Sequence, residues 1–181
     1  MLERIELRNF KSARDLPVRL AALTVLTGLN GSGKSTVLQA LALLKQSLRV
    51  DGLQELALRG ALVRLGRSED VRFENATDDE IGFTVQTSKG QTAMFASAEP
   101  GADTLKLRHV GDIKDVIGAL GSGFQFIQAD RITPAVQYQQ ASTPERVIGW
   151  LGCGGEYTVD FLLQNETMKV SPGRLYPRDH P

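Results

Sequence analysis

The sequence of 181 residues is long enough for one full hydrophobic core and too short for two comfortable ones. Hydrophobic residues make up 41% of the chain and charged residues 23%, which excludes a disordered chain, a collagen-like repeat and a coiled-coil rod. Lys+Arg and Asp+Glu both total 21, so the zero net charge argues against a uniformly basic nucleic-acid-binding surface, whereas a local basic patch stays open.

Cysteine, histidine and long apolar runs are all scarce in this sequence. The single Cys excludes an internal disulfide and a Cys-rich zinc site, and two His residues leave little for a His-based metal site. No apolar run reaches the roughly 18 residues of a membrane span. The first twelve residues alternate charged and apolar side chains, unlike a signal peptide. We therefore expect a soluble, cytoplasmic protein without a membrane partner.

The N-terminal quarter predicts strands followed by one helix. Apolar residues punctuate Leu2–Leu7 and Leu16–Leu20, which predicts two strands of mixed exposure. The run Ala-Leu-Thr-Val-Leu-Thr over residues 22–27 is typical of a strand buried on both faces. Val37–Leu48 is rich in Leu and Ala and contains neither Gly nor Pro, so we expect a helix packed against a sheet.

The middle of the chain changes from helical to alternating patterns. A shorter helical stretch is expected over residues 53–65, broken at Gly60. Residues 70–108 alternate polar and apolar side chains between Asp-Asp, Lys-Gly and Pro-Gly turn signals, which predicts an antiparallel meander with one solvated face. The alternating segments begin at Val71, Ile81, Thr92 and Thr104.

The C-terminal third predicts short helices around one core strand. A helix is expected over residues 112–120 and is broken by the glycines that follow it. Residues 124–129 form a second apolar run, which predicts another core strand. Two further helices are expected over residues 145–151 and 157–163.

The motif that carries chemistry is G-x-x-x-x-G-K-S/T, the Walker A pattern, between the strand at 22–27 and the helix at 37–48. Its glycines permit unusual backbone angles, and the amides of residues 30–36 can point at an anion. The positive end of the helix dipole adds to the attraction of these amides for an anion. Lys34 is expected between the β- and γ-phosphates, and the Ser35 hydroxyl on Mg²⁺. We expect ATP and Mg²⁺ at a site made of Gly28, Asn30, Gly31, Ser32, Gly33, Lys34, Ser35 and Thr36.

Two segments resemble a known family: Ile5-Glu-Leu-Arg-Asn-Phe-Lys-Ser12 and Leu23-Thr-Val-Leu-Thr-Gly-Leu-Asn-Gly-Ser-Gly-Lys-Ser-Thr36. They resemble the SMC/RecF-type ABC ATPase heads, in particular the RecF-like and OLD-like AAA family ATPases of DNA repair and phage defence. The resemblance is strong over residues 1–45, and a weaker one covers Phe124–Arg131 and Pro134. It implies an α/β P-loop NTPase fold in which residues 1–181 form one N-terminal lobe. The meander would then lie beside a mixed or parallel core sheet.

The resemblance also implies roles for residues outside the loop. In such heads the Asn-Phe-Lys-Ser turn lies beside the nucleotide, so Lys11 and Ser12 would approach the phosphates; alternatively, Lys11 is a solvated surface charge. Gln128 would be the lid glutamine that senses Mg²⁺ and the attacking water, although its apolar surroundings equally fit a hydrogen-bonded core amide. Arg131, just beyond the expected strand, would be an exposed functional cation.

Two elements that ABC-type hydrolysis needs are missing from the sequence. A Walker B strand is apolar and ends in Asp-Glu. The run before Asp130 contains two glutamines, and Arg131 stands where the Glu should be, so this segment does not match the motif. Leu151-Gly-Cys-Gly-Gly-Glu156 mimics the signature motif, and we interpret its glycines as a flexible helix-capping turn with Cys153 as a bystander thiol. We therefore expect an incomplete ATPase head that hydrolyses negligibly without a C-terminal lobe or a partner head.

Three functions stay open at this point. The first is an ATP-binding lobe of a RecF/SMC-like ATPase in DNA repair or defence, which acts through head dimerisation; DNA or a nuclease is a partner by family likeness alone. The second is a small P-loop kinase with Asp130 as its Walker B acid and Arg131 or Arg146 as phosphate clamps. The third is a nucleotide-gated interaction module without catalysis.

Overall fold

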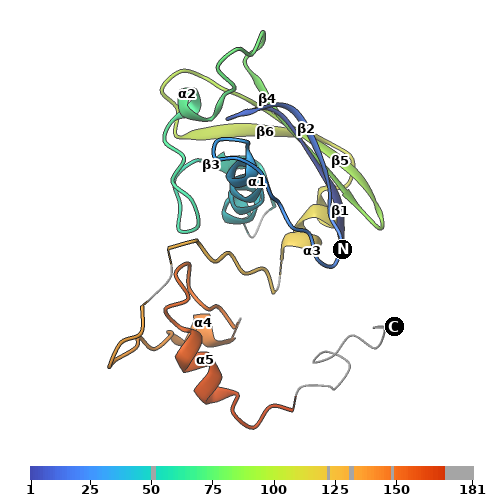
Figure 1. Ribbon diagram of the computed structural model, residues 1–181. Helices are drawn as coiled ribbons and strands as arrows, with labels where there is room; N and C mark the ends of the chain where they lie inside the picture. The colour runs from blue at the N-terminus through green and yellow to red at the C-terminus, as the bar shows by residue number, and fades with distance from the viewer. Residues whose placement is uncertain (50–51, 122, 131–132, 148, 170–181) are drawn as a thin grey trace. The chain divides into compact units, whose positions relative to one another are not determined.

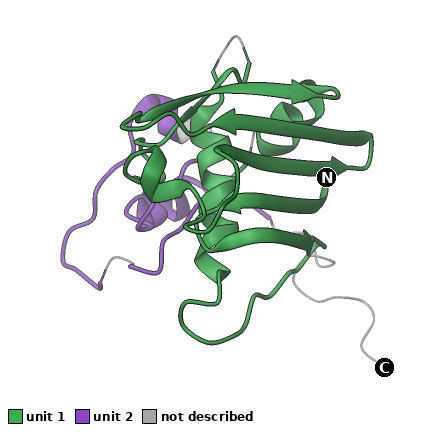
Figure 2. Ribbon diagram, turned by 90° about the horizontal axis from the view of Figure 1, so that it is seen from above, with its two compact units in different colours: residues 1–124 green, residues 125–181 purple. Residues whose placement is uncertain are grey.

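The computed structural model describes residues 1–49, 52–121, 123–130, 133–147 and 149–169. The chain divides into two compact units, residues 1–124 and 125–181, which Figure 2 shows in green and purple. The single lobe over residues 1–181 that the family resemblance implies stays a prediction.

The first unit is built on a six-stranded sheet with the order β2-β1-β4-β5-β6-β3. The pairings β1–β2, β4–β5 and β5–β6 join strands that follow one another, whereas β1–β4 and β3–β6 join distant parts of the chain. The strands are β1 (Leu2–Phe10), β2 (Ala13–Arg19), β3 (Glu55–Ala57), β4 (Glu80–Thr87), β5 (Gly90–Ser97) and β6 (Thr104–Val110).

Every one of these pairings is antiparallel, so the expected mixed or parallel core sheet is wrong for the described residues. Short turns allow neighbouring strands to pair only in the antiparallel sense, whereas a parallel pair needs a crossover of a dozen or more residues. The antiparallel meander expected between residues 70 and 108 is present as β4, β5 and β6.

The core of this unit lies between one face of the sheet and two helices, α1 (Lys34–Ser47) and α3 (Ile113–Leu120). Helix α1 packs against β1 and β3, and α3 packs against β4 and β5, on the same side of the sheet (Figure 1). Alternate residues of each strand point into this core, as the meander pattern predicts. The buried side chains include Ile5, Leu7, Ile81, Phe83, Val85, Met94 and Leu105 from the strands and Val37, Leu43, Leu44, Val116 and Leu120 from the helices.

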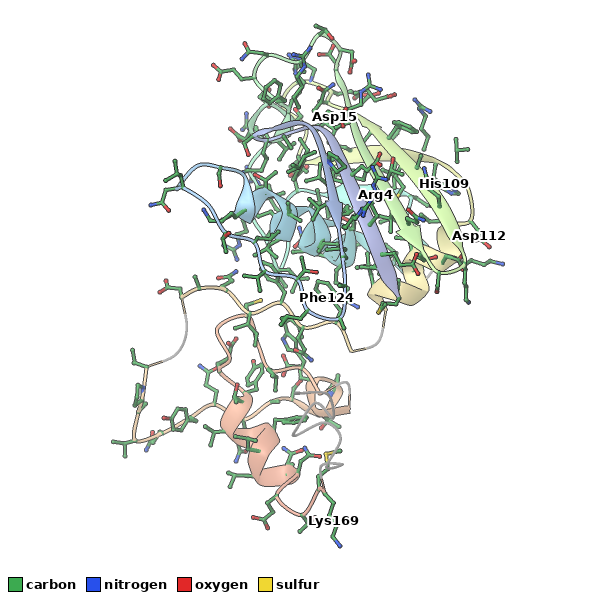
Figure 3. The ribbon with its side chains drawn as sticks, turned by 45° about the vertical axis from the view of Figure 1, so that its right-hand side comes forward. Arg4, Asp15, His109, Asp112, Phe124 and Lys169 are labelled. Carbon is green, nitrogen blue, oxygen red and sulfur yellow. The ribbon has the colours of Figure 1, made fainter. Side chains whose placement is uncertain are left out.

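Local sequence accounts for the starts and ends of these elements. The helix expected at 37–48 forms as α1, and it begins where Gly33 takes a left-handed conformation that glycine adopts without strain. Helix α3 confirms the helix expected at 112–120. Its N-cap is Asp112, labelled in Figure 3, whose side chain accepts the backbone N–H of Lys114 at 2.9 Å.

The apolar run at residues 22–27 forms no strand, although the sequence predicts a buried one. The side chains of Leu23 and Val25 are 81% and 70% exposed. Apolar composition makes a strand suitable for burial, but a strand also needs a neighbour with free backbone groups to pair with. Among the described residues, no strand pairs with this run, and the prediction of a buried strand is wrong there.

The helical stretch expected at residues 53–65 is also wrong. Its first part contains β3, which pairs with β6. Its second part is a tight hairpin in which the Leu65 N–H donates a hydrogen bond to the Leu58 carbonyl. Leu56 and Leu58 are both fully buried, a two-residue spacing typical of a strand. The alternating segment expected to begin at Val71 is the short helix α2 (Ser68–Val71) followed by a single bridge between Arg72 and Phe10.

The second unit contains two short helices, α4 (Thr143–Val147) and α5 (Thr158–Gln164), near the positions that the sequence predicts. The buried carboxylate of Asp160 accepts the backbone N–H of Ala141 at 3.2 Å and the side-chain amide of Gln164 at 2.8 Å. The core strand expected at 124–129 does not form, and Ile127 within it is 42% exposed. No described helix has the length and apolar character to cross a membrane.

Candidate phosphate-binding site

The loop between residues 28 and 33 is shaped by three glycines with positive φ angles. The φ values are 144° at Gly28, 83° at Gly31 and 88° at Gly33, a region that side chains other than hydrogen strongly disfavour. A Cβ atom at Gly28 would lie 3.0 Å from the Ser32 Oγ, and one at Gly33 would lie 3.3 Å from the Ser12 Oγ. The loop therefore needs glycine for its backbone angles, and at two positions a Cβ atom would also come close to a serine hydroxyl.

The ammonium group of Lys34 is folded over this loop. Its Nζ donates hydrogen bonds to the carbonyl oxygens of Gly28 at 2.8 Å and Leu29 at 2.6 Å. Lys34 and Ser35 are the first two residues of α1, whose first turn contains no acidic residue. A positive charge, a hydroxyl group and the positive end of a helix dipole are thus gathered at one place, which suits a phosphate group.

The turn between β1 and β2 reaches the same loop. The Ser12 Oγ lies 2.8 Å from the Oγ1 of buried Thr36 in α1, so the two hydroxyls share a hydrogen bond. Lys11 has a φ of 52°, and its backbone N–H donates to the carbonyl of Val71 at 2.7 Å. The structure thus brings Ser12 to the loop, as the family resemblance implies, and Lys11 is half-buried in the same turn.

A polar network behind this turn was not foreseen from the sequence. Asn9 has a φ of 51° and is buried, and its Nδ2 donates to the Asp78 Oδ1 at 3.0 Å and to the Glu80 carbonyl at 3.1 Å. The other oxygen of Asp78 accepts from Arg8 at 2.8 Å. The backbone N–H of Glu80, helped by the Arg8 guanidinium, lowers the pKa of Asp78 below its ordinary value.

Asn9 tolerates the left-handed conformation better than most residues, and this was the signal available in the sequence. Asp78 carries no such signal, because it lies 69 residues away and meets the turn only in the folded chain. The network holds the turn that carries Ser12 in place beside the loop.

Replacing Asp78 by Asn should therefore destabilise the turn and modestly lower the thermal denaturation temperature at neutral pH. The lowered pKa means that the ionised carboxylate stabilises the fold above about pH 4, and that this contribution is lost as the pH falls through the folded-state pKa. The difference between wild type and variant should shrink as the pH is lowered from 7 toward 3 in a series of thermal melts. Asp79→Asn, at the exposed neighbour, is the matched control and should change little.

Two comparisons with known proteins show the family of this chain. Residues 1–98 match the family model described as the AAA ATPase domain, and this match covers more than half of the chain. The chain belongs to this AAA ATPase family. A stretch of 43 residues is 42% identical to the OLD nuclease of Thermus scotoductus, and it covers 24% of this chain and 8% of that protein. The resemblance to RecF-like and OLD-like AAA family ATPases is confirmed at the level of the family.

Four further residues singled out in the sequence belong to the second unit of this AAA ATPase chain or lie outside the described residues. Gln128 is exposed, and its backbone N–H donates to the Cys153 carbonyl at 2.7 Å. Asp130 is exposed and follows no strand, so the buried strand end that a Walker B acid requires is not formed there. Arg131 and the side chain of Arg146 lie outside the described residues.

The glycine-rich segment before α5 forms a turn. Gly152 and Gly155 have φ values of 82° and 80°, and the Glu156 carboxylate accepts the backbone N–H of Gly154 at 2.8 Å. Burial, with a smaller effect of the Glu156 carboxylate, raises the pKa of the Cys153 thiol. A raised pKa disfavours the reactive thiolate, in keeping with the interpretation of Cys153 as a bystander.

In the part of the chain that the structure describes, no group of three or more His, Cys, Asp and Glu side chains is placed to hold a metal ion. The residues of the loop nevertheless fit a nucleotide that brings its own Mg²⁺, because Ser35 lies beside Lys34 at the start of α1 and its side chain is exposed.

Proposed function

We propose that this chain binds Mg-ATP at residues 28–36 and is the nucleotide-binding part of a RecF- or OLD-type ATPase. The observation that carries the proposal is the glycine loop that enters α1 with the Lys34 ammonium held over it. Membership of the AAA ATPase family supports it. So does the Ser12–Thr36 hydrogen bond, which ties a second segment of the chain to the same loop.

Each part of the site has a distinct role in this proposal. The backbone N–H groups of the loop and of the first turn of α1 bind the α- and β-phosphates. Lys34 exchanges its two carbonyl partners for the β- and γ-phosphate oxygens, and the Ser35 hydroxyl ligates Mg²⁺. Lys11 adds a second positive charge from the β1–β2 turn.

Hydrolysis is proposed to need groups from outside this unit. Residues 124–130 supply no strand on which Asp130 could act as a Walker B acid. We propose that a C-terminal lobe or a partner head completes the site and covers the exposed apolar side chains of Leu23 and Val25. The matched relative is named a nuclease, so we further propose DNA repair or defence as the setting, with DNA or a nuclease as partner.

The length of the phosphate chain provides the test of this site. ATP and ADP should bind to the full chain in the presence of Mg²⁺, because both carry the β-phosphate that Lys34 and the loop recognise. AMP and adenosine should bind at least about tenfold more weakly, which corresponds to about 1.4 kcal/mol. Isothermal titration calorimetry with the four compounds measures this difference.

Chelation of Mg²⁺ supplies the internal control for this experiment. EDTA should weaken ATP binding while leaving the thermal denaturation temperature of the free protein unchanged. Equal affinity for AMP and ATP, or ATP binding that does not respond to Mg²⁺, would contradict a phosphate site with Ser35 as the metal ligand.

A further inference from the structure

A short hairpin, residues 58–65, follows β3 and carries two arginines that face each other. Its strands are joined by hydrogen bonds from the Leu65 N–H to the Leu58 carbonyl at 2.8 Å and from the Gly60 N–H to the Val63 carbonyl at 3.0 Å. Arg59 and Arg64 lie opposite each other in an antiparallel bridge between these two bonds. We call this segment the arginine hairpin.

The two arginines occupy a close, non-hydrogen-bonded pair. Cα atoms of such a pair lie about 4.5 Å apart, and the two side chains leave the hairpin on the same face. Like charges at directly opposite positions destabilise an antiparallel pair. Both side chains are exposed, and within the described residues neither forms an ion pair with a carboxylate.

The segment that carries the pair is rich in positive charge along the sequence, and the Asp70 carboxylate lies against Gly66 near its end. Residues 56–67 contain three arginines and no acidic residue, although the chain as a whole has zero net charge. Arg67, the third, is exposed at the start of α2, and its backbone N–H is bound by the Asp70 carboxylate at 2.8 Å. A surface hollow of about 550 Å³ is lined by Arg59, Gly60, Arg64 and Gly66.

The backbone that presents these arginines is fixed to the core. Leu58, Leu62, Val63 and Leu65 of the hairpin are buried. The Gln46 side chain of α1 accepts the N–H of Val63 at 2.9 Å and donates to the carbonyl of Ala57 at 2.6 Å. A Cβ atom at Gly60 would lie 2.6 Å from the Gln46 Oε1, so the hairpin packs closely against the side chain that holds it.

We propose that Arg59 and Arg64, assisted by Arg67, form a contact site for the phosphodiester backbone of a nucleic acid. A guanidinium group binds phosphate oxygens through two parallel hydrogen bonds, and a phosphate between the two arginines offsets their mutual repulsion. The arginine hairpin carries no aromatic side chain for base stacking, so the contact reads the backbone and not the bases.

The same observations disfavour a lipid surface as the partner. A membrane-binding loop offers apolar side chains together with its cations. Here the large apolar side chains at the tip, Leu62 and Val63, are buried in the protein, and the exposed apolar residue is the small Ala61. The site is separate from the phosphate loop, and the inference does not depend on ATP binding there.

The test is the salt dependence of nucleic-acid binding by the full chain and by the double variant R59Q/R64Q. Fluorescence anisotropy with a labelled duplex and a labelled single strand gives affinities over a range of salt concentrations. Loss of two phosphate contacts should reduce the slope of log K against log[salt] by about 1.8 for the duplex and about 1.4 for the single strand. The matched control R14Q/R19Q removes two exposed arginines of β2 and should leave the slope unchanged.

Charge-preserving and single variants keep the test decisive. R59K/R64K should retain most of the slope, because lysine keeps the positive charge that displaces counterions. If the glutamine pair fails to fold by circular dichroism, R59Q and R64Q should each lower the duplex slope by about 0.9. Mg-ATP affinity should be unchanged in these variants, which separates this site from the phosphate loop.

Several results would overturn the proposal. One is a slope for R59Q/R64Q equal to that of wild type or of R14Q/R19Q. Another is binding of polyglutamate or phosphatidylserine vesicles to the hairpin while both oligonucleotides fail to bind. A loss of Mg-ATP affinity in the folded variants would also contradict a separate site.

Discussion

Lys34→Ala should reduce the affinity for Mg-ATP by about 100-fold or more, which corresponds to about 2.7 kcal/mol. The substitution removes the ammonium that the structure holds over the loop, 2.8 Å from the Gly28 carbonyl. Hydrogen bonds to charged groups contribute about 1.5–3 kcal/mol each, and this lysine is proposed to make more than one to the phosphates. Isothermal titration calorimetry measures the loss directly.

The fold should survive this substitution. Alanine is the best helix former, and Lys34 is the first residue of α1. The two carbonyls that lose a donor belong to exposed residues and can bind water instead. Lys106→Ala, at an exposed position of β6, is the matched control and should leave the affinity unchanged. Wild-type affinity in Lys34→Ala would contradict the proposed phosphate site.

Among the substitutions proposed here, Phe10→Ala should lower the free energy of unfolding most, by about 3–5 kcal/mol. Phe10 is fully buried, and its ring meets that of Phe83 edge to face at a centroid distance of 5.1 Å. It also ends β1 directly before Lys11 and Ser12. Total stabilities of about 5–15 kcal/mol are typical of domains, so a large fraction should be lost in urea denaturation.

A second phenylalanine controls for size and chemistry. Phe95 of β5 is half-buried on the opposite face of the sheet, where the Arg108 guanidinium lies 4.4 Å from its ring centre. Phe95→Ala should cost clearly less than Phe10→Ala, because less apolar surface returns to water. Equal losses in the two variants would show that the contact of Phe10 with Phe83 is not a main support of the core.

Local patterns in the sequence identify the parts of the fold that depend on nearby residues. Helix α1 follows from a run of Ala and Leu after glycine, and the strands β4, β5 and β6 follow from alternation between turn signals. The loop proposed to bind phosphate stands out in the sequence by its glycines and Lys34. In each of these cases the determining residues lie close together in the chain.

Pairing between distant segments is not encoded in the same way. The apolar runs at 22–27 and 124–129 were both expected to be buried strands, yet neither is a strand in its unit. Hydrophobicity describes what a segment can bury, and not which neighbour it meets. The 53–65 segment failed for the same reason, because its strand β3 is defined by pairing with β6.

In the candidate site, too, the features set by nearby residues were predicted and the contacts between distant segments were not. The loop residues and Ser12 follow from motif and family resemblance, and the structure brings Ser12 and Thr36 together. The Asn9–Asp78 pair and the Gln46 side chain that holds the arginine hairpin were not predicted, because each joins segments that come together only after folding.

The antiparallel topology has a consequence for the order in which the site forms. The hairpins β1–β2 and β4–β5–β6 need only local contacts and can form early, whereas β1 and β4 must close a long stretch of chain before they pair. Asn9 reaches Asp78 and Glu80 only after that closure. The turn that carries Ser12 is therefore expected to become ordered only after β1 and β4 have paired, so that, under the proposed function, nucleotide binding during refolding would report this closure.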